Sequence, residues 1–184
     1  SGGMIEVSAG EDWDKFVELT IEKGFADLES LSGIPGTVGG APIQNIGAYG
    51  HEVSETIARV KAYDRKKGEV ITFTNEQCHF SYRNSVFKED AGRYVILNVT
   101  FQLRKGEMSL PITYAELANY LSVNLGDRAP VMKVRQAVLE LRASKGMLLS
   151  LDDHDSWSAG SFFTNPIISQ QAADALPNAA PKWP

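Results

Sequence analysis

The chain has 184 residues, which is enough for one well-packed domain or for one domain and part of a second. Hydrophobic residues make up 43% and charged residues 22%, a balance typical of a soluble globular protein and not of a disordered one. The net charge is −5 and no run of Lys or Arg stands out, so we expect neither nucleic acid nor an anionic membrane as a partner.

The cysteine content and hydropathy point to the cytoplasm. Cys78 is the only cysteine, so no internal disulfide can form, and a reducing compartment is the natural one. No apolar run approaches the ~20 residues of a membrane-spanning helix. Strand-like residues follow directly on the first four, so we expect no signal peptide.

The first predicted elements are a strand over residues 4–8 and an amphipathic helix after it. The apolar positions of this helix follow the helical repeat and are Trp13, Phe16, Val17, Ile21 and Phe25. Acidic residues 11, 12 and 14 suit the positive end of the helix, and Gly24 suits its C-terminal cap.

Residues 32–50 break this pattern with six glycines, two prolines and almost no charge. The segment is too apolar for a solvated linker and too rich in glycine for a regular element. Glycine N–H groups can approach a ligand closely or form an anion-binding nest, and residues 36–40 could open a short helix facing a phosphate. On glycine content alone, a buried crossover without a ligand fits equally well. Neither a dinucleotide fingerprint nor a Walker loop is present.

Three strands and a helix are predicted further along. Residues 56–64 and 69–74 read as a hairpin. Residues 94–104 alternate, and we expect one buried face made of Val95, Leu97, Val99, Phe101 and Leu103. Residues 130–144 predict a helix with an apolar stripe. Because strands and helices are interspersed without a strict βαβ rhythm, the expected class is α+β.

Two further segments contain candidate reactive residues. In HFSYRNSVFK, residues 79–88, Arg83 is a cation in apolar surroundings, which is costly unless an anion pairs with it. Taken alone, it fits better as a loop arginine paired with an acidic residue. In SAGSFFTNP, residues 158–166, Ser161 taken alone is a turn hydroxyl. The GxSxG hydrolase elbow is not formed, because Phe163 replaces the second glycine.

These segments together resemble the UDP-N-acetylenolpyruvoylglucosamine reductases, which are flavin enzymes. GIPGTVGGAPIQNIGAYG resembles their flavin-contacting loop, HFSYRNSVFK their Tyr-Arg-x-Ser-x-Phe-Lys motif, and SAGSFFTNP their Gly-Ser-Phe-Phe-x-Asn-Pro motif. The resemblance implies an FAD-binding domain of the vanillyl-alcohol-oxidase type over residues 1–146. It also implies the start of a substrate-binding domain over residues 147–184.

The resemblance also implies the site residues. Those expected to bind FAD are Gly33, Ile34, Pro35, Gly36, Gly39, Gly40, Asn45, Ile46, Gly47 and Arg142. Arg83 and Ser161 are the implied catalytic residues, and Tyr82, Tyr114, Lys145 and Asn165 the implied substrate contacts. Tyr114 matches the first subclass of the family. Purely structural interpretations of three of these residues remain open. Tyr114 could be an ordinary aromatic at the end of a strand, and Arg142 and Lys145 could be a basic pair at a solvated helix C-terminus.

The implied reaction passes a hydride from NADPH to FAD, and then from flavin N5 to the enolpyruvyl group of a nucleotide sugar, giving UDP-N-acetylmuramate for peptidoglycan. The enzyme is expected to be cytoplasmic and monomeric at full length. By the family pattern, a flavin-binding segment precedes residue 1 and a catalytic carboxylate follows residue 184. The 184-residue fragment alone is therefore expected to be inactive and to hold FAD poorly.

No metal site is expected, because the three histidines lack zinc-ligand spacing. A different oxidase of the same flavin fold is the alternative.

Overall fold

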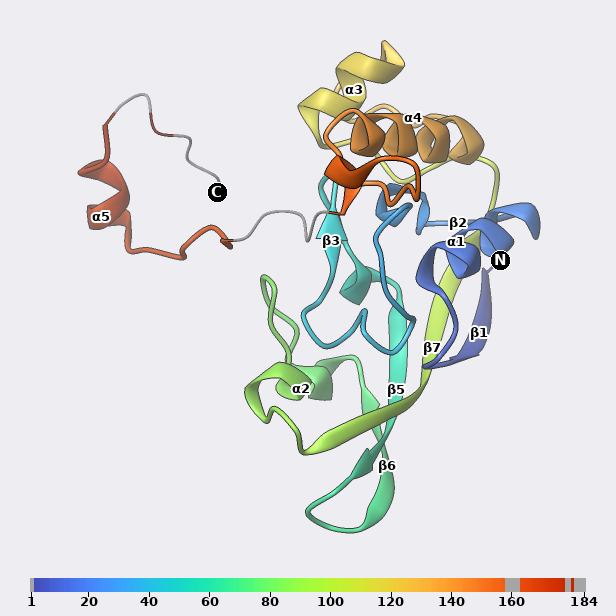
Figure 1. The fold of residues 1–184 in the computed structure, drawn as a ribbon, viewed down its shortest axis with the longest axis vertical. Helices are drawn as coiled ribbons and strands as arrows, with labels where there is room; N and C mark the ends of the chain where they lie inside the picture. The colour runs from blue at the N-terminus through green and yellow to red at the C-terminus, as the bar shows by residue number, and fades with distance from the viewer. Residues whose placement is uncertain (1, 158–162, 178–179, 181–184) are drawn as a thin grey trace.

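The structure is a computed structural model that describes residues 2–157, 163–177 and 180. Figure 1 shows a twisted sheet with its longest helices at one end, and a C-terminal segment that extends away from the rest. None of the helices in these ranges is long and apolar enough to cross a membrane.

The main sheet is antiparallel and is organised about one long strand. β7 (Tyr94–Lys105) pairs with β1 (Gly2–Ser8) on one side and with β5 (Ile57–Asp64) on the other. β6 (Glu69–Thr74) continues the sheet beyond β5, and β2 (Phe25–Ala26) pairs with the end of β7. The four longer strands were all predicted from the sequence, and these predictions are confirmed.

The buried face of β7 changes at Leu97. Lys61 of β5 pairs with Asn98, but the next residue, Ala62, pairs with Ile96, so Leu97 is an extra residue in β7. Such a bulge reverses the alternation of side chains beyond it. The predicted burial of Val95 is therefore wrong: Val95 is 44% exposed, and its neighbours Tyr94 and Ile96 pack on the core instead.

α1 (Trp13–Glu22) is capped as predicted but ends earlier than expected. The Asp12 carboxylate accepts a hydrogen bond from the Lys15 N–H, and Gly24, at φ 76°, donates its N–H to the Ile21 carbonyl. The left-handed turn at Gly24 stops the helix. Phe25 consequently lies in β2 and not on the helix, so its predicted helical position is wrong.

The helices other than α1 are α2 (Val86–Glu89), α3 (Ala115–Leu121), α4 (Val131–Ala143) and α5 (Gln170–Asp174), within the described ranges. Only α4 was predicted, because the other three have four to seven residues and show no helical repeat. α3 and α4 pack on each other around Leu117, Val134 and Val138. Short 3-10 helices cover 29–31, 53–55, 76–78 and 154–156. The predicted α+β class is confirmed.

Candidate cofactor and active site

The glycine segment, residues 32–50, runs over the end of β1 and the start of α1. The Val38 N–H donates to the Glu11 carbonyl at 2.9 Å, and the Gly39 N–H donates to the Ala9 carbonyl at 2.9 Å. A Cβ on Gly39 would lie 2.6 Å from the Cβ of Ala9, so this close approach requires glycine. The backbone forms successive turns, and residues 36–40 do not open the short helix that was one of the possibilities.

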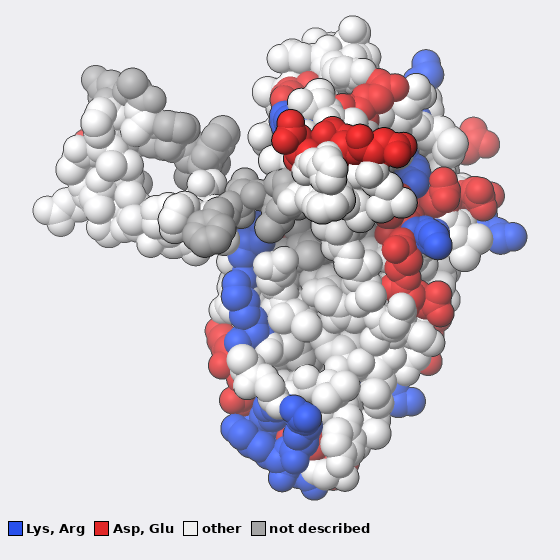
Figure 2. Space-filling model, viewed as in Figure 1, with Lys and Arg blue, Asp and Glu red and all other residues white. Residues whose placement is uncertain are grey.

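The exposed part of this segment presents backbone donors. The N–H groups of Ile34, Gly36 and Thr37 have no acceptor within the described part of the chain, and Gly36 and Thr37 are exposed. Gly36 has φ 119°, which favours glycine. Figure 2 shows an uncharged, hollowed face in this region, bordered by Lys and Arg on one side and by Asp and Glu on the other. Successive free N–H groups on such a face suit a phosphate.

Two arginines of α4 fix the start of the segment at Gly33. The Asp14 carboxylate accepts the Gly33 N–H at 2.6 Å and both ends of the Arg135 guanidinium at 2.7 and 2.9 Å. Arg142 Nε donates to the Gly33 carbonyl at 3.1 Å, and its Nη2 donates to the Met147 carbonyl at 3.0 Å. Gly33 has φ 70°, and a Cβ there would lie 2.9 Å from Leu139.

Burial and hydrogen bonding shift the pKa values of the charged groups beside Gly33. Burial opposes ionisation of Asp14, but hydrogen bonds from Arg135 and Gly33 outweigh it and hold the pKa of Asp14 below its usual value. Burial lowers the pKa of Arg142, whose hydrogen bonds in the described structure go to neutral carbonyls. An anion beside Arg142 would therefore find a partly desolvated cation without a paired carboxylate.

Arg83 fixes the other end of the segment. Its Nη2 donates to the Gly47 carbonyl at 2.6 Å, and its Nη1 lies 3.3 Å from the Asn45 carbonyl and 3.5 Å from a carboxylate oxygen of Glu52. Its guanidinium also lies 5.0 Å from the ring centre of Tyr82. Arg83 has φ 53° and its side chain remains 25% exposed. The pairing of Arg83 with an acidic residue, which the sequence left open, is therefore present alongside its contact with the glycine segment.

The Asn45 side chain is used entirely within the protein. Its amide nitrogen donates to Glu52 at 2.6 Å and to the Ser81 carbonyl at 3.1 Å, and its oxygen accepts the Ser54 N–H at 3.1 Å. Asn45 is fully buried. It therefore joins the glycine segment to the motif that carries Arg83.

Tyr114 and Lys145 lie near the far end of the glycine segment. The rings of Tyr114 and Tyr49 meet edge to face, 5.6 Å apart. Lys145 Nζ lies 2.6 Å from the carboxylate of Glu116, and this hydrogen bond raises the pKa of Lys145. Burial raises the pKa of Tyr49. Two of the expected substrate contacts thus come from adjoining segments, the residues just after α4 and the residue just before α3.

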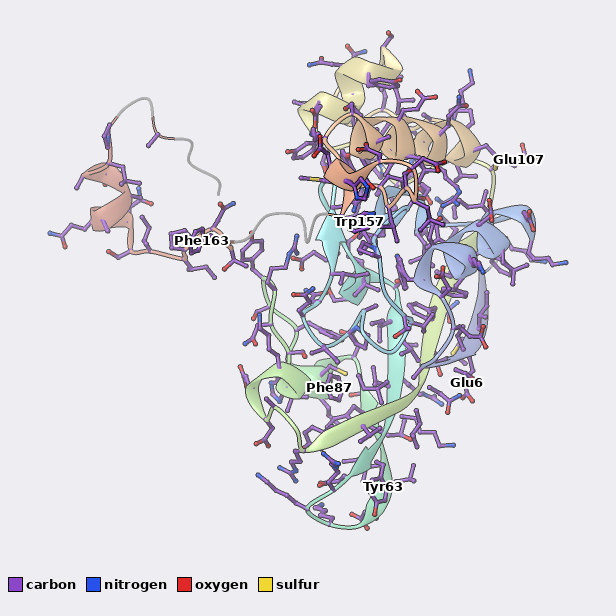
Figure 3. The ribbon with its side chains drawn as sticks, in the orientation of Figure 1. Glu6, Tyr63, Phe87, Glu107, Trp157 and Phe163 are labelled. Carbon is purple, nitrogen blue, oxygen red and sulfur yellow. The ribbon has the colours of Figure 1, made fainter. Side chains whose placement is uncertain are left out.

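The structure brings most of the sequence-predicted residues that it describes together and leaves Asn165 apart. The glycine segment contacts Arg83 and Arg142 directly. Ser161 lies outside the described residues. Asn165 is exposed, in the segment that Figure 1 shows extending away from the rest. Figure 3 shows Phe163 on that segment and Trp157 beside the helices.

Sequence reasoning missed several residues that hold the site. Asp14 and Arg135, which are 121 positions apart, carried no local signal. Tyr49 lies inside the glycine segment and could have been noted as an aromatic among glycines. Glu52 and Glu55 form a capping box at the start of the 3-10 helix 53–55. Their spacing, a carboxylate three positions before a glutamate, could have predicted this helix start from the sequence.

Comparison with known proteins agrees with the motifs. The family model described as an FAD binding domain matches residues 1–74. The UDP-N-acetylenolpyruvoylglucosamine reductase of Streptomyces avermitilis is 50% identical over 98% of this chain and 53% of its own length. The Cutibacterium acnes reductase is 53% identical over 99% of this chain and 48% of its own length. The Mycobacterium avium reductase is 45% identical over 100% of this chain and 52% of its own length.

A solved structure shares the fold. The crystal structure of the reductase from Thermus caldophilus superimposes with a TM-score of 0.54 and 23% identity, covering 77% of this chain and 43% of that one. The sequence identity to the Streptomyces avermitilis and Cutibacterium acnes reductases confirms the resemblance expected from the motifs over nearly the whole chain. The chain spans about half the length of the relatives that it matches.

Proposed function

We propose that this chain carries the flavin and substrate contacts of a UDP-N-acetylenolpyruvoylglucosamine reductase, an enzyme of peptidoglycan precursor synthesis. The observation that supports this most is the meeting of the family's separate motifs at one segment. Arg83 binds the Gly47 carbonyl and Arg142 binds the Gly33 carbonyl, so both ends of the glycine segment are held by residues of other motifs.

FAD is the proposed cofactor, and when bound it supplies the hydride chemistry, with NADPH as reductant. The N–H groups of Gly36 and Thr37, which have no acceptor among the described residues, suit its phosphates. Arg142 would add a cation that no described carboxylate pairs with. Residues 1–146 would form the flavin-binding part and residues 147–184 the start of the substrate-binding part.

Arg83 would stabilise negative charge that develops on the substrate carboxylate, since fixed donors aimed at developing charge are often the largest catalytic contribution. Ser161 would donate the proton that completes the reduction. Tyr82, Tyr114, Lys145 and Asn165 would hold the nucleotide sugar, and that binding free energy can be used to orient the reacting alkene. We expect a cytoplasmic monomer at the relatives' full length, and an inactive protein when these 184 residues are alone.

Two half-reactions test this proposal in a protein of the relatives' full length. NADPH should bleach the flavin absorbance, and UDP-N-acetylglucosamine enolpyruvate should restore it in the absence of oxygen. Ser161→Ala should keep the bleaching and lose most of the recovery. A flavin that NADPH bleaches but the enolpyruvyl substrate never reoxidises in the unsubstituted protein would contradict the proposal. Equal losses in both halves for Ser161→Ala would refute only the role of Ser161.

A further inference from the structure

His51 connects the glycine segment to the residues that lead into Tyr114. It lies in β4 (His51–Glu52), which pairs with β3 (Gly47–Ala48). Its Nδ1 is 2.9 Å from a carboxylate oxygen of Glu55, and its Nε2 is 3.3 Å from the carbonyl oxygen of Pro111. The His51 side chain is only 13% exposed. A single ring therefore joins two segments that are 60 positions apart.

Both partners of the His51 ring can only accept a hydrogen bond. A carbonyl oxygen has no proton to donate, and neither has a carboxylate. Burial raises the pKa of Glu55, but hydrogen bonds from His51 and from the Glu52 N–H outweigh it and hold that pKa below its ordinary value. A neutral imidazole has one N–H and one unprotonated nitrogen. Only the imidazolium, with two N–H groups, can therefore make both bonds at once.

The surroundings of His51 favour this charged form. Among the described residues, the carboxyl groups that act on it electrostatically are Glu55, at the end of the 3-10 helix 53–55, and Glu29, from the 3-10 helix 29–31. Burial raises the pKa of Glu29. The Glu55 hydrogen bond raises the pKa of His51, burial opposes it, and the Pro111 carbonyl and Glu29 add to the rise. The second oxygen of Glu55 accepts the Glu52 N–H at 2.8 Å, which holds the carboxylate in place for the ring.

The segment that His51 binds also contacts the glycine segment at two further points. Gly50 has φ 86° and lies so close to Thr113 that a Cβ there would clash with its Oγ1. Tyr49 packs edge to face on Tyr114. Residues 51, 50 and 49 thus lie against residues 111, 113 and 114, respectively. Of these contacts, only the one made by His51 changes with protonation.

We propose that His51 is a positioning residue whose imidazolium ties residues 111–114 to the glycine segment and so sets the place of Tyr114. Loss of the ring proton would remove one of the two bonds. The longer bond, to the Pro111 carbonyl, is the one expected to break, since the shorter bond joins the ring to a carboxylate. The consequence for substrate binding rests on the proposed function, whereas the protonation-dependent contact does not.

The test uses the 184-residue chain with 15N-labelled histidine, without flavin or substrate. Long-range 1H–15N spectra, recorded from about pH 5 to about pH 9, should show both His51 nitrogens protonated above the ordinary histidine midpoint of ~6.5. Glu55→Gln should move that midpoint down. His154→Gln, at an exposed histidine of the 3-10 helix 154–156, should leave it unchanged, and loss of the titrating signal in His51→Gln assigns it to His51.

Hydrogen exchange of residues 109–114 gives the second measurement. After correction for the intrinsic effect of pH, exchange should rise roughly threefold to tenfold through the His51 midpoint, as expected for the loss of one hydrogen bond. In His51→Gln this step should be absent, and in Glu55→Gln it should occur at lower pH. The inference is overturned if His51 has one unprotonated nitrogen at about pH 6. It is equally overturned if the exchange profile is the same in His51→Gln. Because neither measurement needs turnover, failure here is distinguishable from failure of the proposed enzyme activity.

Discussion

The Nη2 atom of Arg83 lies 2.6 Å from the carbonyl oxygen of Gly47, so the guanidinium is oriented by the backbone of the glycine segment. Gly47 in turn has no room for a side chain, because a Cβ there would lie 2.7 Å from Nη1 of Arg83. The two residues fix each other. Arg83 is therefore expected to matter both for the local fold and for the reaction, and substitutions can separate the two contributions.

In a protein of the relatives' full length, activity should fall from Arg83 to Lys to Met. Lysine keeps the charge and loses the planar fork that can hold a carboxylate with two hydrogen bonds, whereas methionine loses both. The methionine variant should lose roughly 3 kcal/mol or more of transition-state stabilisation, in the half-reaction that reduces the substrate. Stopped-flow measurement of each half-reaction checks this.

Arg65→Met is the matched control for Arg83, because Arg65 also donates to a backbone carbonyl, that of Gly92, but on the distant β5–β6 hairpin. It should leave both half-reactions unchanged. If Arg83→Met turned over normally while melting several degrees lower, Arg83 would be a structural residue paired with Glu52 and nothing more.

Gly39→Ala should destabilise the chain through steric overlap at the end of β1. A Cβ at Gly39 would lie 2.6 Å from the Cβ of Ala9 and 3.0 Å from its carbonyl oxygen, and the backbone has little freedom to move away. Overpacking of this kind costs about 1–3 kcal/mol. Urea unfolding followed by circular dichroism measures it. Gly10→Ala is the control, since nothing lies within 4 Å of its added Cβ, and it should be close to neutral.

Periodicity predicted the long elements because each contains its own signal. The alternation of Val99, Phe101 and Leu103 and the stripe on α4 need no partner to be recognised. The motifs predicted which segments meet, and Arg83 and Arg142 do contact the glycine segment. The motifs contain no information on how the contacts are made.

What the sequence did not predict depends on pairings between distant residues. The bulge at Leu97 exists only in the register between β5 and β7, so the exposure of Val95 could not be inferred from β7 alone. The Asn45 side chain hydrogen-bonds to the backbones of Ser81 and Ser54, which belong to other segments, so the glycine segment alone could not have predicted its burial. The binding of Asp14 by Arg135 has the same origin.

Asp14→Asn should destabilise the chain and loosen the start of the glycine segment. Asp14 accepts two hydrogen bonds from Arg135, whose side chain is only 9% exposed, and a third from the Gly33 N–H. The asparagine leaves that arginine without a full partner, at a cost of about 1–3 kcal/mol. Glu18→Gln is the control, since Glu18 lies 3.5 Å from the same arginine but is 57% exposed, and it should cost under about 1 kcal/mol. If both variants lost the same free energy of unfolding, the hydrogen bond from the Gly33 N–H to Asp14 would add nothing to stability.

Asp64 should contribute to stability at neutral pH and lose that contribution in acid. Its side chain is inaccessible to solvent and accepts hydrogen bonds from Arg93 and from the N–H groups of Lys66 and Lys67. The Arg93 hydrogen bond is the main cause that lowers the pKa of Asp64 to about 2, below the ordinary value of 3.8. Because the pKa is lower in the folded chain, the contribution is complete above the ordinary value and disappears as the pH falls through about 2.

Thermal melting of Asp64→Asn beside the unsubstituted chain, from neutral pH into acid, measures this contribution of Asp64. The difference in Tm should be largest at neutral pH and should shrink steadily below the ordinary pKa of the carboxyl, because the aspartate is then protonated in both folded and unfolded chains. Arg93→Lys should show a smaller difference with the same pH dependence, since lysine keeps the charge but not the several hydrogen bonds of the guanidinium. A Tm difference that stayed constant from neutral pH into acid would show that Asp64 stabilises the hairpin through packing and not through its charge.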